Sequence, residues 1–267
     1  MCRILATMYS AESSGISELL LKFGKLANEG KTPPGSPSGH RDGWGLVAYK
    51  DAHVALYERN AMPATEDAKF VEAVRKISEL KPAVIVGHLR KASGSGNKIV
   101  NTHPFVRNAW TFCHNGTVFS SEQIPLDPAY MNAVEGESDS EKLFFYFLQS
   151  MDGNDHQSGN ILRERLTAAI RFIRDTRDYT AMNFILTDGE TLLATHEVNE
   201  KNAYVQKGNL CESYYTLYVG MSAENKHLYI CSEPLPIPGV EWNLMENHTI
   251  LEAAFTKAGS SYSLTKI

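Results

Sequence analysis

The sequence predicts an α+β protein in which helices cover two β-sheets. Short apolar segments of strand character are bounded by turn residues. Other segments repeat apolar residues every three or four positions, as amphipathic helices do. The strands of the second half follow one another directly, unlike alternating βαβ units. The 267 residues show no internal repeat or charged linker and can bury a large core, so we expect one domain over 1–267.

The first sixty residues are expected to form a strand, a helix and a hairpin. Leu5–Tyr9 has the pattern of a short buried strand. A helix with one apolar face follows, formed by Leu19, Leu20, Phe23, Leu26 and Ala27. Residues 28–43 are rich in Gly, Pro and Ser and predict a long loop, which inside a compact domain is commonly functional. Segments 43–50 and 53–60 predict a β-hairpin.

The next helix is expected to begin after Thr65 as its N-cap, with Glu66 and Asp67 near its positive end. Its apolar face would consist of Phe70, Val71, Val74 and Ile77. Pro82 would end it, because proline is poorly tolerated in a helix interior. A buried strand is expected over 83–90.

The rest of the chain is expected to be strand, two helices and then strands. A strand over 109–116 would end in a turn at Asn115-Gly116. Ser138 and Glu141 have capping-box spacing ahead of an apolar helix, and 161–173 predicts a second amphipathic helix. Four strands should follow, with Asp188-Gly189 as a hairpin turn; they cover 181–189, 191–198, 215–222 and 227–235.

Composition and charge exclude several classes of protein. The net charge is -5 and the sequence pI is about 6.0, which is unlike a nucleic-acid binder. No apolar run approaches the length of a membrane span or of a signal-peptide core. The cysteines are scattered and form no CxxC pair, namely Cys2, Cys113, Cys211 and Cys231. We therefore expect a cytoplasmic protein with reduced thiols and without nucleic-acid or membrane partners.

Histidines gather in the first half of the chain, each near a turn or a strand end: His40, His88, His103 and His114. With Cys113 and Asp42 they could form a metal site. However, the helical HExxH spacing is absent, and Cys113 and His114 would point to opposite faces of one strand. The alternative is that these imidazoles orient loops by hydrogen bonds, so we expect no metal.

Six short segments carry the most specific pattern, namely MCRIL, GHRDGWG, GHLRKASGSG, NTHPF, CHNGTV and GESDSEK. Their order and approximate spacing resemble the class II glutamine amidotransferases of the N-terminal-nucleophile hydrolase superfamily. The resemblance is closest to the small stand-alone branch, which includes bacterial amidotransferase homologues and the γ-glutamyl hydrolase of ergothioneine biosynthesis. It implies a four-layer αββα sandwich, with the catalytic motifs in 2–148 and with 181–255 completing the sandwich.

The resemblance implies that Cys2 is the nucleophile after Met1 has been removed. A free α-amine, with a pKa of about 7.7–8.0, could then take the thiol proton directly or through water. With Met1 attached, that nitrogen belongs to an amide and cannot act as a base. Taken alone, Cys2 is better explained as a small buried residue of the first strand.

Asn115 and Gly116 stand where the family forms its oxyanion hole, from a side-chain amide and a backbone N–H. Asn-Gly is also simply a favourable tight turn. The resemblance assigns Arg90 to the substrate's α-carboxylate, through forked hydrogen bonds, and Asp139 to its α-ammonium group. An ordinary ion pair for Arg90 and a helix-dipole role for Asp139 remain open.

Ser93 and Gly94 would line the substrate loop that follows Arg90. Lys91 stands where larger relatives often carry an aromatic residue, and Ser93 replaces a common threonine, so the shape of this loop can differ. The remaining family positions would shape the site without performing chemistry: Asp42, Gly43, Trp44, His88, His103 and His114. Trp44 is more readily explained as a packing residue than as a stacking platform.

The function that the resemblance implies is hydrolysis of a γ-glutamyl amide, either glutamine or a γ-glutamyl metabolite, through a Cys2 thioester. Ammonia could pass to a partner synthase, and a homo-oligomer is also open. The reaction requires no metal or organic cofactor. One alternative is a non-catalytic regulatory or scaffolding subunit that retains the fold. Another is a metal-dependent hydrolase that uses the histidine cluster.

Overall fold

Two antiparallel sheets lie face to face in the computed structural model, which describes residues 2–10, 14–152, 159–222, 226–256 and 259–267. The first sheet has the order β11-β9-β10-β1-β4-β2-β3. Its strands are β1 (Arg3–Tyr9), β2 (Gly43–Lys50), β3 (His53–Asn60), β4 (Val84–Arg90), β9 (Tyr218–Met221), β10 (His227–Cys231) and β11 (Glu241–Leu244).

The second sheet has the order β13-β12-β8-β7-β6-β5. Its strands are β5 (Phe105–Arg107), β6 (Trp110–Val118), β7 (Tyr179–Thr187), β8 (Thr191–His196), β12 (Thr249–Thr256) and β13 (Gly259–Lys266). The last third of the chain therefore contributes strands to both sheets.

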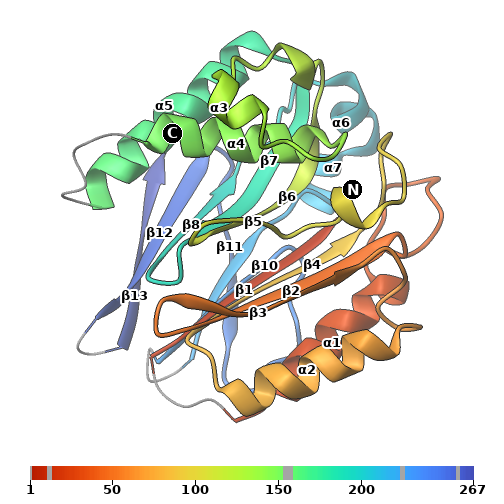
Figure 1. Ribbon diagram of the computed structural model, residues 1–267. Coiled ribbons are helices and arrows are strands. Elements are labelled where there is room, and N and C mark those ends of the chain that lie inside the picture. The colour runs from red at the N-terminus through yellow and green to blue at the C-terminus, as the bar shows by residue number, and fades with distance from the viewer. Residues whose placement is uncertain (1, 11–13, 153–158, 223–225, 257–258) are drawn as a thin grey trace.

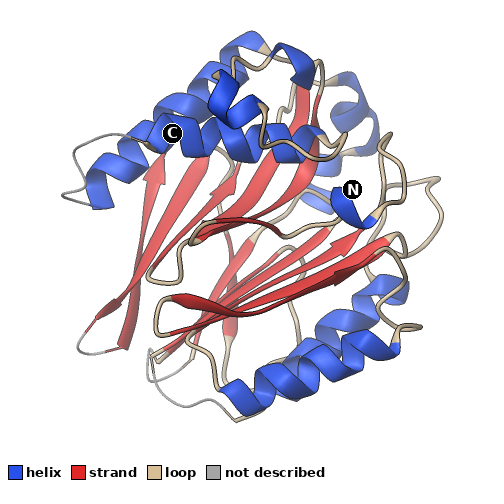
Figure 2. Ribbon diagram, viewed as in Figure 1, coloured by secondary structure: helices blue, strands red, loops and turns tan. Residues whose placement is uncertain are grey.

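Helices form the two outer layers (Figures 1 and 2). α1 (Ile16–Glu29) and α2 (Ala68–Leu80) cover the first sheet, while α4 (Asp139–Met151) and α5 (Gly159–Thr176) cover the second. The shorter helical segments are η1 (Ile99–Asn101), η2 (Ser121–Gln123), α3 (Pro128–Met131), α6 (Ala203–Gly208) and α7 (Leu210–Ser213). The expected α+β class and four-layer αββα order are confirmed.

The alternation of side chains along each strand explains why the first sheet has one core on each of its faces. In β1, Ile4, Ala6 and Met8 belong to the apolar core between the two sheets, whereas Leu5 and Tyr9 belong to the core under α1 and α2. Successive strand side chains point to opposite faces, so β1, which is buried at every position, is covered on both of its faces. Full burial of a side chain such as Leu5 contributes about 1.5–3 kcal/mol.

The core under α4 and α5 is rich in aromatic residues. Phe112 of β6 stacks on Phe144 of α4 with 5.3 Å between ring centroids, and Phe184 of β7 packs against Phe112 at 5.4 Å. No helix in the described ranges is long and apolar enough to cross a membrane.

Four local predictions are wrong. Asp67, not Thr65, is the N-cap of α2, because its Oδ1 accepts from the Lys69 backbone while its Oδ2 accepts from Trp44 and Asn60. Val71 is 56% exposed, and Ala73 takes its place on the buried face.

The capping box at α4 is also absent. Ser138 does cap the helix. However, Glu141 accepts from the backbones of Glu135 and Gly136, at 3.1 and 2.7 Å, instead of reaching back to Ser138. The fourth error concerns Asn115-Gly116, which lies inside β6 and not in a turn.

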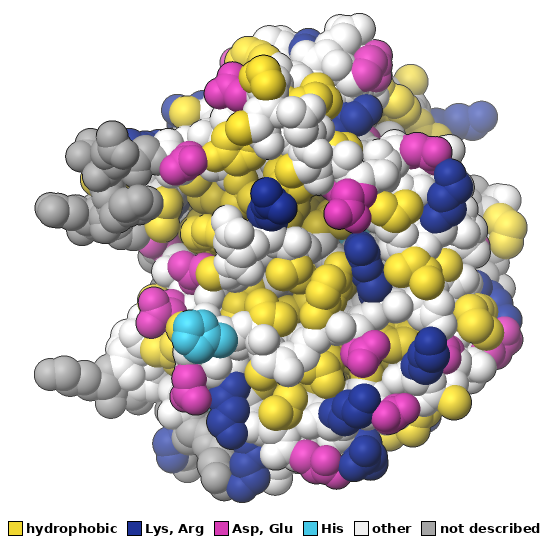
Figure 3. All heavy atoms as spheres, viewed as in Figure 1, with side chains coloured by type: hydrophobic (Ala, Val, Ile, Leu, Met, Phe, Trp, Pro, Cys, Tyr) yellow, Lys and Arg dark blue, Asp and Glu magenta, His cyan; other side chains and the backbone are white. Residues whose placement is uncertain are grey.

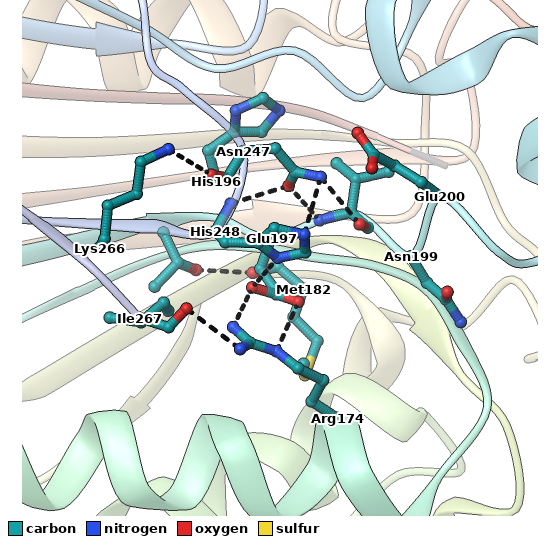
Figure 4. A network of polar contacts seen from close by, with 12 residues as sticks. Arg174, Met182, His196, Glu197, Asn199, Glu200, Asn247, His248, Lys266 and Ile267 are labelled. Atoms are coloured by element: carbon teal, nitrogen blue, oxygen red, sulfur yellow. Dashed lines mark hydrogen bonds and ion pairs between the residues drawn. The ribbon is translucent and has the colours of Figure 1, made fainter.

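A buried carboxylate lies directly after β8, at one end of the second sheet (Figure 4). Glu197 is fully buried and accepts hydrogen bonds from Arg174 of α5, from the Tyr179 hydroxyl and from His248. Arg174 also donates to the backbone carbonyl of Ile267 at 3.1 Å. The network therefore ties α5, the end of β8 and the last strand together.

Candidate active site

The candidate nucleophile lies between the two sheets. Cys2 directly precedes β1 and is 7% exposed. Its backbone nitrogen donates to Asn115 Oδ1 at 2.9 Å. Its Sγ lies 3.8 Å from the backbone carbonyl oxygen of Lys91. A residue at the start of β1 in one sheet is thus bonded to a side chain from β6 in the other.

Asn115 and Gly116 directly precede a β-bulge. Asn115 pairs with Asn183 of β7 and Gly116 with Met182, and the register then slips before Val118. A bulge re-aims the backbone groups of its strand. A Cβ on Gly116 would lie 1.8 Å from the Ala181 carbonyl oxygen, so only glycine fits there.

The side-chain nitrogen of Asn115 is buried and has no hydrogen-bond partner within the described residues. A buried N–H without a partner costs about 1–3 kcal/mol. Such a donor is suited to an oxygen that a ligand brings into the site.

The two backbone amides that follow Gly116 bind side chains. The Thr117 backbone N–H donates to Thr180 Oγ1 at 3.0 Å, and that of Val118 donates to Asp139 Oδ2 at 2.8 Å. Asp139 is the first residue of α4, so its carboxylate lies at the positive end of the helix. The structure therefore brings Asp139 to the strand that carries Asn115 and Gly116.

His114 fills the space behind the bulge. Its Nε2 lies 3.0 Å from the Ala181 carbonyl oxygen, which can only accept, so Nε2 carries the proton. Nδ1 then accepts from the Ser140 hydroxyl at 2.9 Å. Burial lowers the pKa of His114, with Asp139 opposing this, and the neutral ring holds α4 against β6.

Arg90 ends β4 and is 3% exposed. Its Nη2 donates to the backbone oxygens of Ser95 and Gly96 and to the Ser95 hydroxyl, and its Nη1 donates to Asn97 Oδ1 at 3.1 Å. The guanidinium therefore organises the loop that follows its own strand. Ser93, in that loop, lies 3.3 Å from Thr117 through their hydroxyl oxygens.

Gly94 has a φ of +103°, with open space where a side chain would project. Asp42 fixes the start of the same loop by accepting from the Ala92 backbone at 2.8 Å. Gly43, with a φ of +149°, has no room for a Cβ beside the Asn60 carbonyl. Trp44 packs edge-on against Phe70 in the core under α2, which agrees with a packing role.

His88 and His103 form a buried pair with 4.3 Å between ring centroids. Burial lowers both pKa values, that of His88 to about 3. His40 instead bonds the Lys31 carbonyl through Nε2 at 3.1 Å. Among the residues that the structure describes, no group of three or more His, Cys, Asp or Glu side chains could hold a metal ion.

Sequence motifs missed several residues around Cys2. Arg3 is 1% exposed, donates to the carbonyls of Lys31 and Tyr214, and pairs with Glu233 at 3.4 Å. A charged residue at the start of an apolar strand was the one available signal. Thr180, Tyr214 and Tyr215 gave no local signal, because their partners are distant in sequence.

A large pocket lies away from Cys2. It has a volume of about 570 Å³ between the β5–β6 turn, α3 and α4, with Arg107, Trp110, Tyr130 and Leu148 among its lining residues. On the face shown in Figure 3, hydrophobic side chains gather between the upper helical layer and the strands below it. None of the predicted site residues lines this pocket.

Comparisons with known proteins agree with the motif pattern. The family model described as class II glutamine amidotransferases matches residues 1–212. An uncharacterised protein of Methanocaldococcus jannaschii is 29% identical over 227 residues, which cover 79% of this chain and 61% of that protein. The chain thus spans less than two thirds of this relative's length.

Two further relatives extend the comparison. The Escherichia coli protein named "Putative glutamine amidotransferase YafJ" is 25% identical over 211 residues, which cover 74% of each chain. The solved structure of a glutamine aminotransferase class-II domain protein from Silicibacter pomeroyi has a TM-score of 0.57 at 17% identity, with full coverage of both chains. The similarity to this solved structure shows the fold alone.

Proposed function

The chain belongs to the class II glutamine amidotransferases, and from that premise we propose that it hydrolyses a γ-glutamyl amide through a thioester on Cys2. The observation that carries the proposal is the contact between Cys2 and Asn115. The Asn115 side chain accepts from the Cys2 nitrogen at 2.9 Å while its own N–H₂ group is buried without a partner in the described chain. A nucleophile and an oxyanion donor are thus adjacent.

The proposed reaction starts after Met1 has been removed. The freed α-amine of Cys2 takes the thiol proton, and the thiolate attacks the γ-carbonyl carbon. Asn115 Nδ2 and the Gly116 N–H stabilise the oxyanion. The C–N bond then breaks, and the leaving amine receives the proton from the α-ammonium group of Cys2. Water attacks the thioester, and glutamate and the free thiol result.

The glutamyl half of the substrate is proposed to bind between Arg90 and Asp139. Arg90 would bind the substrate's α-carboxylate through the guanidinium N–H groups that do not bond the loop over 95–97. Ser93 and Gly94 would lie along the same loop. Asp139 would bind the α-ammonium group while it continues to accept from Val118. The released amine is either ammonia or a larger amine from a γ-glutamyl metabolite. Ammonia would pass to a partner synthase or be released into water.

Intact-mass analysis tests this proposal. We expect loss of Met1, and a covalent adduct on Cys2 after incubation with a diazo-ketone analogue of glutamine. Incubation with glutamine and a panel of γ-glutamyl compounds should show which leaving group is released. Cys2→Ala should form no adduct and show no turnover with an unchanged circular dichroism spectrum, because a small side chain still fits at the start of β1.

The control is Cys211→Ala. Cys211 is a half-buried cysteine whose thiol pKa is raised to about 11 by burial and by Glu200, so this variant should keep the adduct. A processed protein that forms no adduct and releases no glutamate would instead favour a non-catalytic subunit that retains the fold.

A further inference from the structure

Two consecutive tyrosines join the two sheets next to Cys2. Tyr214 accepts from Arg3 Nη1 through its backbone oxygen at 3.4 Å, and the Arg3 guanidinium lies 4.3 Å above its ring. Arg3 directly follows Cys2 and belongs to the first sheet. Tyr214 is therefore bound to the sheet that carries the candidate nucleophile.

Tyr215 is bound to the second sheet at both of its ends. Its backbone oxygen accepts from Asn183 Nδ2 at 2.9 Å and lies 2.7 Å from His196 Nε2. Its hydroxyl donates to Thr180 Oγ1 at 2.9 Å. Tyr215 is fully buried, so these bonds are formed away from water, where they hold position most firmly.

Thr180 connects Tyr215 to the bulge in β6 by hydrogen bonds. The same Oγ1 that accepts from Tyr215 also accepts from the Thr117 backbone N–H at 3.0 Å. The peptide that carries this N–H is the one between Gly116 and Thr117. The direction of the bulge next to Gly116 therefore depends on a hydroxyl oxygen held in place by Tyr215.

We propose that Tyr215, acting through Thr180, is a positioning residue that holds the oxyanion donors Asn115 and Gly116 in register with Cys2. The inference rests on the proposed function. It concerns residues 214 and 215, beyond the segment 1–212 that the family model matches. Tyr214 and Tyr215 set the distance between nucleophile and donors because each is bound to a different sheet.

The first test replaces Thr180 by valine, which has the same shape and strand preference but no acceptor for Thr117. Loss of one aligned hydrogen bond at the bulge should lower kcat about tenfold, with KM unchanged. Thr180→Ser retains the oxygen and should return kcat to within about threefold of the wild type.

The second test removes only the Tyr215 hydroxyl, which donates to Thr180. Tyr215→Phe should lower kcat in the same way as Thr180→Val, and the double variant should be no worse than either single variant, because both act on one bond chain. Tyr49→Phe is the matched control. Its hydroxyl is also buried and contacts Ala109 at 2.7 Å, Thr111 and Thr187. Thr111 and Thr187 lie at the opposite end of the β6–β7 pair from the bulge, so kcat should be unchanged.

Binding of two ligands distinguishes a loss of donor positioning from general damage to the binding site. The γ-aldehyde analogue of glutamate adds to the thiol and places an oxyanion in the hole, whereas glutamate does not. Thr180→Val and Tyr215→Phe should weaken aldehyde binding about tenfold and leave glutamate binding unchanged. Equal weakening of both ligands, or no change in either, would overturn the inference. A wild-type protein that fails to add the aldehyde would instead overturn the proposed function itself.

Discussion

The backbone nitrogen of Cys2 and the side-chain oxygen of Asn115 lie 2.9 Å apart although 113 residues separate them in the chain. One side chain thus holds the candidate nucleophile with its oxygen, while its nitrogen has no partner among the described residues and can bind a ligand. Asn115→Asp keeps the acceptor for Cys2 but removes the donor. We expect kcat to fall about 10²–10³-fold, measured as glutamate release. A variant with normal kcat would contradict the oxyanion role.

Asp139 serves the protein as well as the proposed substrate, since its carboxylate accepts from Val118 at 2.8 Å. Asp139→Asn keeps an acceptor oxygen for this amide but removes the charge. We expect KM to rise about 10–100-fold, the value of a hydrogen bond to a charged group, with kcat within a few-fold. Asp139→Ala should lower kcat as well, because the bulge amide loses its partner. Steady-state kinetics on both variants separates the two roles.

Arg174 compensates a buried charge. Glu197 is completely buried, and Arg174 binds both of its carboxylate oxygens. Arg174→Met should lower the free energy of unfolding by about 3–5 kcal/mol, because it leaves an uncompensated carboxylate. Arg75→Met, which breaks the exposed pair with Glu79, should cost at most about 0.5 kcal/mol. Urea denaturation measures both, and similar losses would contradict the prediction.

His88 and His103 predict how stability depends on pH. Burial lowers their pKa values in the folded protein, that of His88 from 6.5 to about 3, so the unfolded chain binds protons first as pH falls. Stability should be unaffected by these groups above pH 6.5 and should decline below it. The loss should be about 1 kcal/mol per histidine between pH 6.5 and 5.5. Replacement of His88 by Gln should reduce this slope, and an unchanged slope would exclude the histidine as its source.

Local patterns in the sequence predicted most of the elements. The hairpin over 43–50 and 53–60 has the predicted bounds, and the buried face of α1 is the predicted one. Both depend on the spacing of apolar residues within about fifteen positions. The six motifs likewise identified the family, because they are short and each is read within the sequence itself.

The errors occurred where distant partners override local preference. Thr65 and Asp67 are both good N-caps, and the contacts of Asp67 with Trp44 and Asn60 selected the second. Asn115-Gly116 favours a turn by itself, but pairing with β7 draws it into a strand with a bulge. No local pattern contains such a partner.

The sequence by itself determined most of the elements, the two-sheet class and the motif residues, because hydrophobic spacing and short motifs are properties of neighbouring positions. Only the tertiary structure decided how those residues meet. It bonded Cys2 to Asn115, attached Asp139 to Val118 and held Arg90 within its own loop. These contacts join segments that are far apart in the chain or depend on how a loop folds back. The packing of two sheets therefore fixes them, and residue preference does not.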